Sequence, residues 1–135
     1  MSEHPTAAGR SSYDVVDTDL FWKVLSVEPG MTVLDLACGA GRYTLPLAER
    51  VGRSGRVIAV DLWAEGIHRL QTEAGAAGLD NIEAHVVDAA RKLPIPPGGV
   101  DLCLLATTLH DFAADGTDRA VLTQIARVLH PQGIL

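Results

Sequence analysis

Four short strand-like segments, alternating with helical segments and turns, constrain the fold of this 135-residue chain more than any other feature. They cover residues 31–37, 56–62, 82–87 and 100–106, and all but the third are almost wholly apolar. Residues 64–77, between the second and third segments, carry apolar side chains at helical spacing, and residues 118–129, after the fourth, repeat that pattern. Apolar strands alternating with helices predict an α/β domain whose parallel sheet is covered on both faces.

The order of the strands follows from the handedness of their connections. Right-handed crossovers place the first three strands side by side, and the fourth returns to the other side of the first. We therefore predict a three-layer α/β/α, Rossmann-like fold with a mostly parallel sheet in the order 3-2-1-4. Residues 130–133 predict a turn, and Ile134–Leu135 begin a partial fifth strand. We expect an unpaired edge beside the fourth strand, which favours a homodimer through that edge.

Composition divides the chain and excludes some functions. Residues 1–16 are polar and predict a disordered arm, whereas residues 17–135 form one domain that begins with a helix capped by Asp17 or Thr18. The net charge of −6 without a basic stripe argues against binding to nucleic acid. No apolar run approaches the roughly 20 residues of a membrane span. Cys38 and Cys103 show no metal-ligand spacing, and they predict reduced thiols in a cytoplasmic protein.

Acidic residues stand at or near the ends of three successive strands: Asp35, Asp61 and Asp88. Open α/β sheets bind ligands at the carboxyl ends of their strands, beside the point where the strand order reverses. Gly39 and Gly41 follow the first acid and allow a tight turn that a ligand can approach closely. The helix after this turn directs free N–H groups and its positive end toward the same place.

The residue types in the glycine turn distinguish between two kinds of nucleotide ligand. A dinucleotide fingerprint requires G-x-G-x-x-G, but Thr44 stands at the third position. Asp35 would repel a pyrophosphate and attract an ammonium group. Asp61 can accept hydrogen bonds from both ribose hydroxyls, and Asp88 with the Ala89 N–H can bind an adenine ring. A ribose, an adenine and an amino-acid head without phosphates describe S-adenosylmethionine.

Five motifs in this order resemble those of class I S-adenosylmethionine-dependent methyltransferases, over roughly residues 20–135. They are VLDLACGAG at 33–41, VD at 60–61, VDA at 87–89, DLCLLA at 101–106 and RVLHPQG at 127–133. The resemblance implies that Gly39 and Gly41 flank the methionine portion and that Asp35 orients the amino-acid head. It also implies that Asp61 binds the ribose and that Asp88 and Ala89 bind the adenine. The same resemblance adds Ala37, Leu62 and Ala106 to the predicted cofactor contacts.

The chain departs from this family at two points. The family often has glycine at the position of Ala37. Its fold usually has seven strands ending in an antiparallel hairpin, whereas this chain stops at the start of the fifth. The domain is therefore expected to be incomplete at its C-terminal end.

Each predicted site residue also has a structural interpretation. Asp35 can be a buried acid satisfied by the glycine turn, Asp61 a solvated strand end, and Asp88 a cap of the proline-rich loop. Cys38 lacks an evident base and is predicted to be a packing residue. His110 is the candidate general base, because its pKa lies near neutrality, and it can equally be a helix cap.

These observations predict a methyltransferase that uses S-adenosylmethionine, binds no metal ion, and acts on a small molecule rather than on nucleic acid or a membrane. Two alternatives stay open. One is an NAD(P)-binding oxidoreductase domain, which the missing third glycine and Asp35 disfavour. The other is a noncatalytic cofactor-binding module that a partner chain completes.

Overall fold

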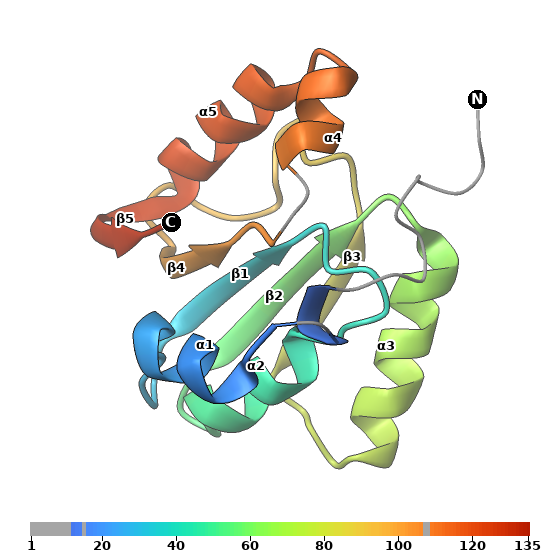
Figure 1. Cartoon of the computed structure of the whole chain (residues 1–135), viewed down its shortest axis with the longest axis vertical. Helices are drawn as coiled ribbons and strands as arrows, with labels where there is room; N and C mark the ends of the chain where they lie inside the picture. The colour runs from blue at the N-terminus through green and yellow to red at the C-terminus, as the bar shows by residue number, and fades with distance from the viewer. Residues whose placement is uncertain (1–11, 15, 107–108) are drawn as a thin grey trace.

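The computed structural model describes residues 12–14, 16–106 and 109–135, with Ser12 and His110 described by their backbone alone. One parallel sheet runs through the domain in the order β3-β2-β1-β4-β5 (Figure 1). Its strands are β1 (Thr32–Leu36), β2 (Arg56–Asp61), β3 (Ile82–Val86), β4 (Val100–Leu104) and β5 (Leu129–Ile134). The helices are η1 (Ser12–Asp14), α1 (Thr18–Leu25), α2 (Thr44–Val51), α3 (Ala64–Ala76), α4 (Leu109–Ala114) and α5 (Asp118–Val128). The predicted fold class and strand order are confirmed.

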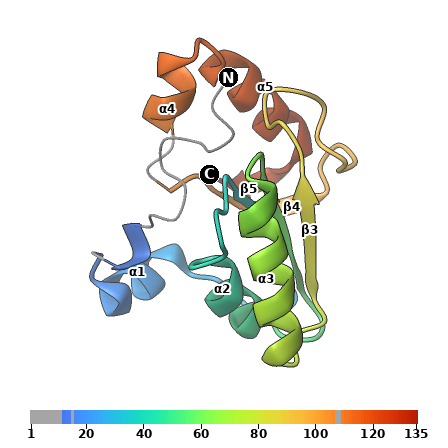
Figure 2. The ribbon, with the colours of Figure 1, turned by 90° about the vertical axis from the view of Figure 1, so that its right-hand side faces the viewer.

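Two apolar cores lie on opposite faces of the sheet, because successive side chains of a strand point to opposite sides. Val33 of β1 packs with the core that includes α2, whereas its neighbour Leu34 packs with the core that includes α5. In Figure 2, α4 and α5 accordingly lie well away from α1 and α2. Both residues of this pair are fully buried. This burial explains why the first strand reads as an almost continuous apolar run.

The fifth strand corrects two sequence-based expectations. Residues 130–133, predicted as a turn, lie inside β5, which pairs with β4 through Val100–Leu129 and Leu102–Ile134 with a register shift between them. A Cβ at Gly133 would come within 2.8 Å of a Leu129 methyl carbon, so the segment folds tightly on itself. The turn-forming residues thus produce an irregularity within the strand. As a result β4 is not unpaired, and β5 forms the outer edge of the sheet.

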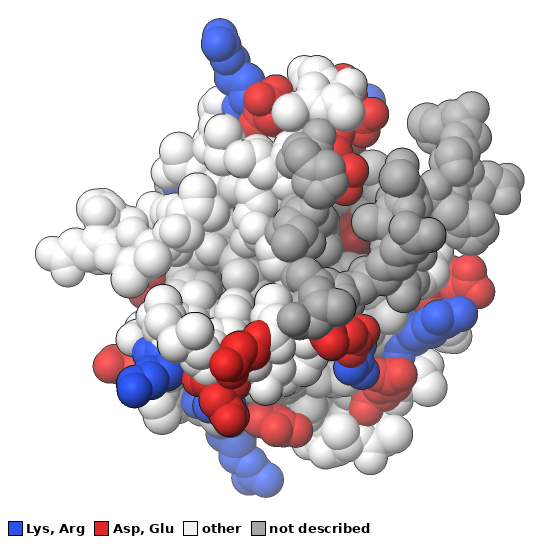
Figure 3. All heavy atoms as spheres, in the orientation of Figure 1, with Lys and Arg blue, Asp and Glu red and all other residues white. Residues whose placement is uncertain are grey.

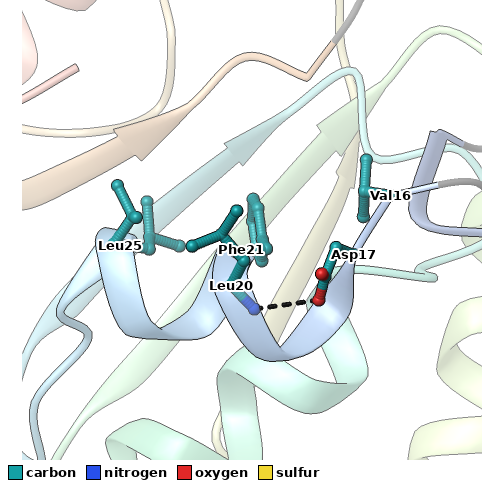
Figure 4. Close-up of a pocket in the computed structure, with 6 residues that line it drawn as sticks. Val16, Asp17, Leu20, Phe21 and Leu25 are labelled. Carbon is teal, nitrogen blue, oxygen red and sulfur yellow. Dashed lines mark hydrogen bonds between the residues drawn. The ribbon is translucent and has the colours of Figure 1, made fainter.

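The described part of the predicted arm packs onto the domain. Most of residues 1–16 lie outside the described ranges, but residues 12–14 form η1, and Tyr13 packs edge-to-face against Tyr43 with ring centroids 5.1 Å apart. The Asp17 side chain caps α1 by accepting a hydrogen bond from the Leu20 N–H at 3.1 Å, which confirms the predicted cap (Figure 4). Tyr13 therefore packs against the core that includes α2.

The surface differs between regions of the molecule. A shallow hollow along α1 is lined by Val16, Asp17, Leu20, Phe21, Val24 and Leu25, none of which is a predicted site residue (Figure 4). On the face drawn in Figure 3, charged side chains gather near α1 and along the α3 side, whereas the area over β4 and β5 is mostly uncharged.

Across the described ranges, no helix combines the length and apolarity needed to cross a membrane.

Candidate functional site

The glycine turn after β1 has the tight conformation that the sequence predicts. The Gly41 N–H donates to the Cys38 carbonyl at 3.1 Å, and the Cys38 N–H donates to the Val60 carbonyl of β2 at 3.0 Å. Gly39 and Gly41 both have positive φ angles, +58° and +92°, which glycine adopts without steric cost. Ala37 also has a positive φ, +60°, where a side chain is strained. The family's frequent glycine at this position thus has a conformational reason.

Asp61 joins the turns that follow β1 and β2. One carboxylate oxygen accepts a hydrogen bond from the Gly39 N–H at 2.8 Å, and the other accepts one from the Trp63 N–H at 2.8 Å. The side chain is half-buried. A carboxylate offers about four acceptor positions, so Asp61 can still accept two hydroxyl donors. This geometry places Asp61 at the glycine turn, where the sequence analysis predicts a ribose-binding carboxylate.

Asp35 lies on the same rim of the sheet but in a different environment. It is only 2% exposed, and its carboxylate accepts a hydrogen bond from the Thr44 hydroxyl at 2.6 Å. The pKa of Asp35 is raised to about 7: burial is the largest cause, the Thr44 hydrogen bond opposes it, and the negative charge of Asp61 adds to it. The structural interpretation of the sequence expected backbone N–H groups as partners of Asp35, and a side-chain hydroxyl takes that role here.

Thr44 is a site residue that the sequence analysis missed. It is fully buried at the start of α2, where a dinucleotide site would have its third glycine. The available signal was a hydroxyl residue opening the helix that follows an acid-containing strand. Because the hydroxyl donates to Asp35, Thr44 fixes the orientation of that carboxylate.

The glycines around the turn differ in what surrounds them. A Cβ at Gly41 would lie 2.4 Å from a Leu70 methyl carbon, and a Cβ at Gly66 would lie 2.3 Å from the Trp63 ring and 2.9 Å from the Gly39 carbonyl. These two glycines therefore let α3 pack closely on the turn. Among the described residues, a Cβ at Gly39 would meet nothing within 4 Å, so the space beside Gly39 is open with respect to that part of the chain. This open side is where a ligand can approach the turn.

The end of β3 is tied to the end of β2. The Val87 N–H donates to the Asp61 carbonyl at 3.1 Å, and the Asp88 carboxylate accepts from the Ala90 N–H at 2.9 Å. Asp88 thus begins a turn, as its structural interpretation expected, and its carboxylate also lies 3.9 Å from the Arg91 side chain. Ala89 is buried with its side chain in the core, whereas Leu62 is 58% exposed beside Asp61.

The segment after β4 carries the remaining predicted residues. Ala106 is half-buried, and Phe112 of α4 packs against the core that includes α5. Thr107, Thr108 and the side chain of His110 lie outside the described residues, so the role of His110 stays a prediction.

The two cysteines are free thiols in apolar surroundings. Burial raises the pKa of Cys38 far above its ordinary value, and nearby Asp35 and Asp61 raise it further. Burial, with a smaller contribution from Asp35, raises the pKa of Cys103 to about 12. Neither thiol is therefore ionised near neutral pH, which disfavours nucleophilic catalysis. Among the described residues, no group of three or more His, Cys, Asp or Glu side chains converges on one point.

The parallel sheet and its strand order, with acidic residues at or near the ends of β1, β2 and β3, define a Rossmann-like α/β domain. A family model described as "Methyltransferase domain" matches residues 33–133, and the chain belongs to this family. It is 30% identical over 128 residues to a nocamycin O-methyltransferase from Saccharothrix syringae, which covers 90% of this chain and 44% of that protein. It is 34% identical to the ubiquinone/menaquinone biosynthesis C-methyltransferase UbiE of Shewanella baltica, over 85% of this chain and 47% of that protein.

A solved structure agrees with this assignment. The S-adenosylmethionine-dependent methyltransferase of Aquifex aeolicus superposes with a TM-score of 0.78 at 30% identity, over 90% of this chain and 62% of that one. The [4+2]-cyclase SpnF superposes with a TM-score of 0.73 at 24% identity, over 94% of this chain and 45% of that one, and this likeness shows the fold alone. The chain spans about half the length of the curated relatives that it matches.

Proposed function

We propose that this chain binds S-adenosylmethionine at the carboxyl ends of β1, β2 and β3 and serves methyl transfer to a small molecule. One observation carries the proposal: Asp35 and Asp61 lie at the carboxyl ends of two neighbouring parallel strands, and Asp61 bonds the N–H of Gly39, which has open space beside it among the described residues. Carboxylates at this position favour a cationic ligand with a ribose and disfavour a diphosphate. Membership of the methyltransferase family supports the same ligand.

The residues present fit the parts of this cofactor. Asp61 has acceptor positions left for two ribose hydroxyls after its bonds to the Gly39 and Trp63 N–H groups. Asp88 and the backbone of Ala89 would bind the adenine, and the exposed Leu62 side chain would cover its face. Asp35 would orient the amino-acid head. The remaining predicted contacts with the methionine portion are Ala37, Gly39, Gly41 and Ala106.

The work of these residues in a transfer reaction is mainly alignment. When bound, S-adenosylmethionine supplies a methyl carbon activated by a sulfonium group. The carboxylates hold the cofactor at fixed points, so that an acceptor atom can approach the methyl carbon in line. His110 would take a proton from acceptors that must lose one. Cys38 and Cys103, which stay protonated near neutral pH, take no part.

A small-molecule acceptor is part of the proposal. The net charge of −6 disfavours the phosphate contacts that nucleic acids require. Two relatives carry names of O- and C-methyltransferases, and the acceptor atom can be oxygen, carbon, nitrogen or sulfur. The free thiols favour a cytoplasmic location. The exposed Ile134 and Leu135 at the outer edge of the sheet favour a homodimer through β5.

Calorimetry with S-adenosylmethionine, S-adenosylhomocysteine and NAD tests the proposal. We expect the first two to bind, and we expect Asp61→Ala to weaken their binding by about 1.5–3 kcal/mol, the range for hydrogen bonds to a charged group. Asp101→Ala is the matched control, because Asp101 also accepts a backbone N–H bond, from Thr32 at 2.9 Å, at the amino end of the strands. The control should bind like the wild type.

The opposite results would identify the alternatives. Tighter binding of NAD than of S-adenosylmethionine would favour the oxidoreductase domain and contradict the proposal. Cofactor binding without transfer to any metabolite in a mass-spectrometric screen for a gain of one methyl group would favour the noncatalytic module.

A further inference from the structure

Four aromatic rings gather where η1 meets the start of α2, next to the glycine turn. Tyr43, which directly precedes α2, is only 7% exposed and is contacted by Tyr13 at 5.1 Å and by Phe21 at 5.2 Å between ring centroids. Trp22 completes the cluster, 4.9 Å from Phe21 and 6.3 Å from Tyr13. Tyr13 therefore covers the buried ring of Tyr43, which lies two residues after Gly41 in the sequence.

A charged pair links the same two segments. The Arg42 guanidinium forms an ion pair with the Asp14 carboxylate, and it also lies 5.8 Å from the centroid of the Tyr13 ring. Both side chains of the pair are more than half exposed. In Figure 1 the dark blue η1 segment lies beside the loop that follows β1. Arg42 is thus connected to the glycine turn at one end and to η1 at the other.

An ion pair this exposed contributes little to the stability of a fold. Its physical effect is to restrict the position of the short segment that it holds. Here that segment carries Tyr13, which also contacts the rings of Tyr43 and Trp22. Loss of the pair would remove the ionic contact that holds η1 to Arg42.

We propose that Asp14 and Arg42 are positioning residues that form a clasp: the pair holds Tyr13 on Tyr43 and encloses the glycine-turn side of the cofactor site. This inference rests on the proposed binding of S-adenosylmethionine at that turn. The clasp keeps η1 and the glycine turn together while the cofactor is bound, so opening it speeds cofactor release. Asp14 also neutralises Arg42 beside a cofactor that carries a positive sulfonium.

The charge of the sulfonium separates this role from a merely structural one. Asp14→Asn leaves the Arg42 cation unbalanced, and this charge opposes S-adenosylmethionine more than S-adenosylhomocysteine, which has no sulfonium. Arg42→Ala opens the clasp without creating an unbalanced cation. The two substitutions should therefore differ in their preference between cofactor and product, although both open the clasp.

Surface plasmon resonance with the immobilised chain and each compound in solution tests the clasp. We expect Asp14→Asn and Arg42→Ala to raise the dissociation rate of S-adenosylhomocysteine by about three- to fivefold, the upper range for an exposed ion pair. We expect Asp14→Asn to lower the affinity for S-adenosylmethionine by a further factor of about three. The exchange of both charges, Asp14→Arg with Arg42→Asp, should restore wild-type rates within about twofold.

Arg56→Ala is the matched control, because the Arg56–Glu83 pair has similar exposure and lies at the amino ends of β2 and β3. It should dissociate like the wild type. Circular dichroism of each variant verifies the fold. Wild-type rates in Asp14→Asn and Arg42→Ala would overturn the clasp while leaving the cofactor site intact. A wild-type chain that binds neither compound would overturn both the clasp and the proposed function.

Discussion

The turns after β1, β2 and β3 differ from the segment after β4 in how they are held. Carboxylate and backbone hydrogen bonds connect the first three exits, through the Cys38–Val60, Gly39–Asp61 and Val87–Asp61 contacts. After β4, the described residues include apolar side chains that remain exposed, such as Leu109 and Leu122. The turns of the proposed cofactor site are thus held by backbone geometry, whereas the segment after β4, which carries the candidate base His110, presents exposed side chains. Three substitutions test this difference.

Asp35→Asn should have the largest effect. The pKa of Asp35 is raised from 3.8 to about 7 in the folded chain, so the native state holds a proton that the unfolded state has lost. Wild-type stability should therefore fall as the pH rises from about 4 to about 7, by up to about 4 kcal/mol. Asn carries no charge at any pH, so the variant should lack this fall and be more stable than the wild type at about pH 8.

Urea unfolding at about pH 5 and about pH 8 measures this slope. Asp101→Asn, at an exposed carboxylate on the other end of the sheet, serves as the control and should keep the wild-type dependence. Parallel pH dependences for the wild type and Asp35→Asn would show that Asp35 ionises normally, and would contradict the buried environment described for it. The same variant should bind S-adenosylmethionine more weakly than the wild type.

Ala37→Gly should stabilise the fold by about 0.5–1 kcal/mol. The positive φ of Ala37 strains a Cβ by roughly 1–2 kcal/mol, and part of the gain is offset by the greater freedom of glycine in the unfolded chain. Ala76→Gly, in the last turn of α3, is the opposite control and should destabilise by about 1 kcal/mol. Thermal unfolding compares the two, and destabilisation by both would contradict the strained conformation at Ala37.

Leu122→Ser should have the smallest effect. Leu122 lies on α5, in the segment after β4, and its side chain is 37% exposed. Its replacement should change stability by about 0.5 kcal/mol or less and leave the affinity for S-adenosylhomocysteine unchanged in calorimetry. A clear loss of affinity would show that the segment after β4 is coupled to the proposed cofactor site, and would contradict the difference between the two regions.

The sequence predicts the sheet and the glycine turn because both rest on local patterns. Strand burial is visible as apolar runs, and the positive φ angles of Gly39 and Gly41 are visible as glycines. The β5 irregularity was not predictable, since Pro131 and Gly133 favour a turn locally and only pairing with β4 extends them. Thr44 was missed because its hydrogen bond to Asp35 joins residues nine positions apart. The geometry of the turn between them cannot be read from the sequence.

The double hydrogen bonding of Asp61 has a consequence for how a ligand is received. The Asp61 side chain bonds the backbone of two separate turns, so these turns are already ordered in the chain without a ligand. Ligand binding therefore loses little conformational entropy by ordering them. The reverse also holds: removing this one carboxylate, as in Asp61→Ala, would loosen both turns together. The affinity for a ligand and the rigidity of the two turns therefore both depend on Asp61.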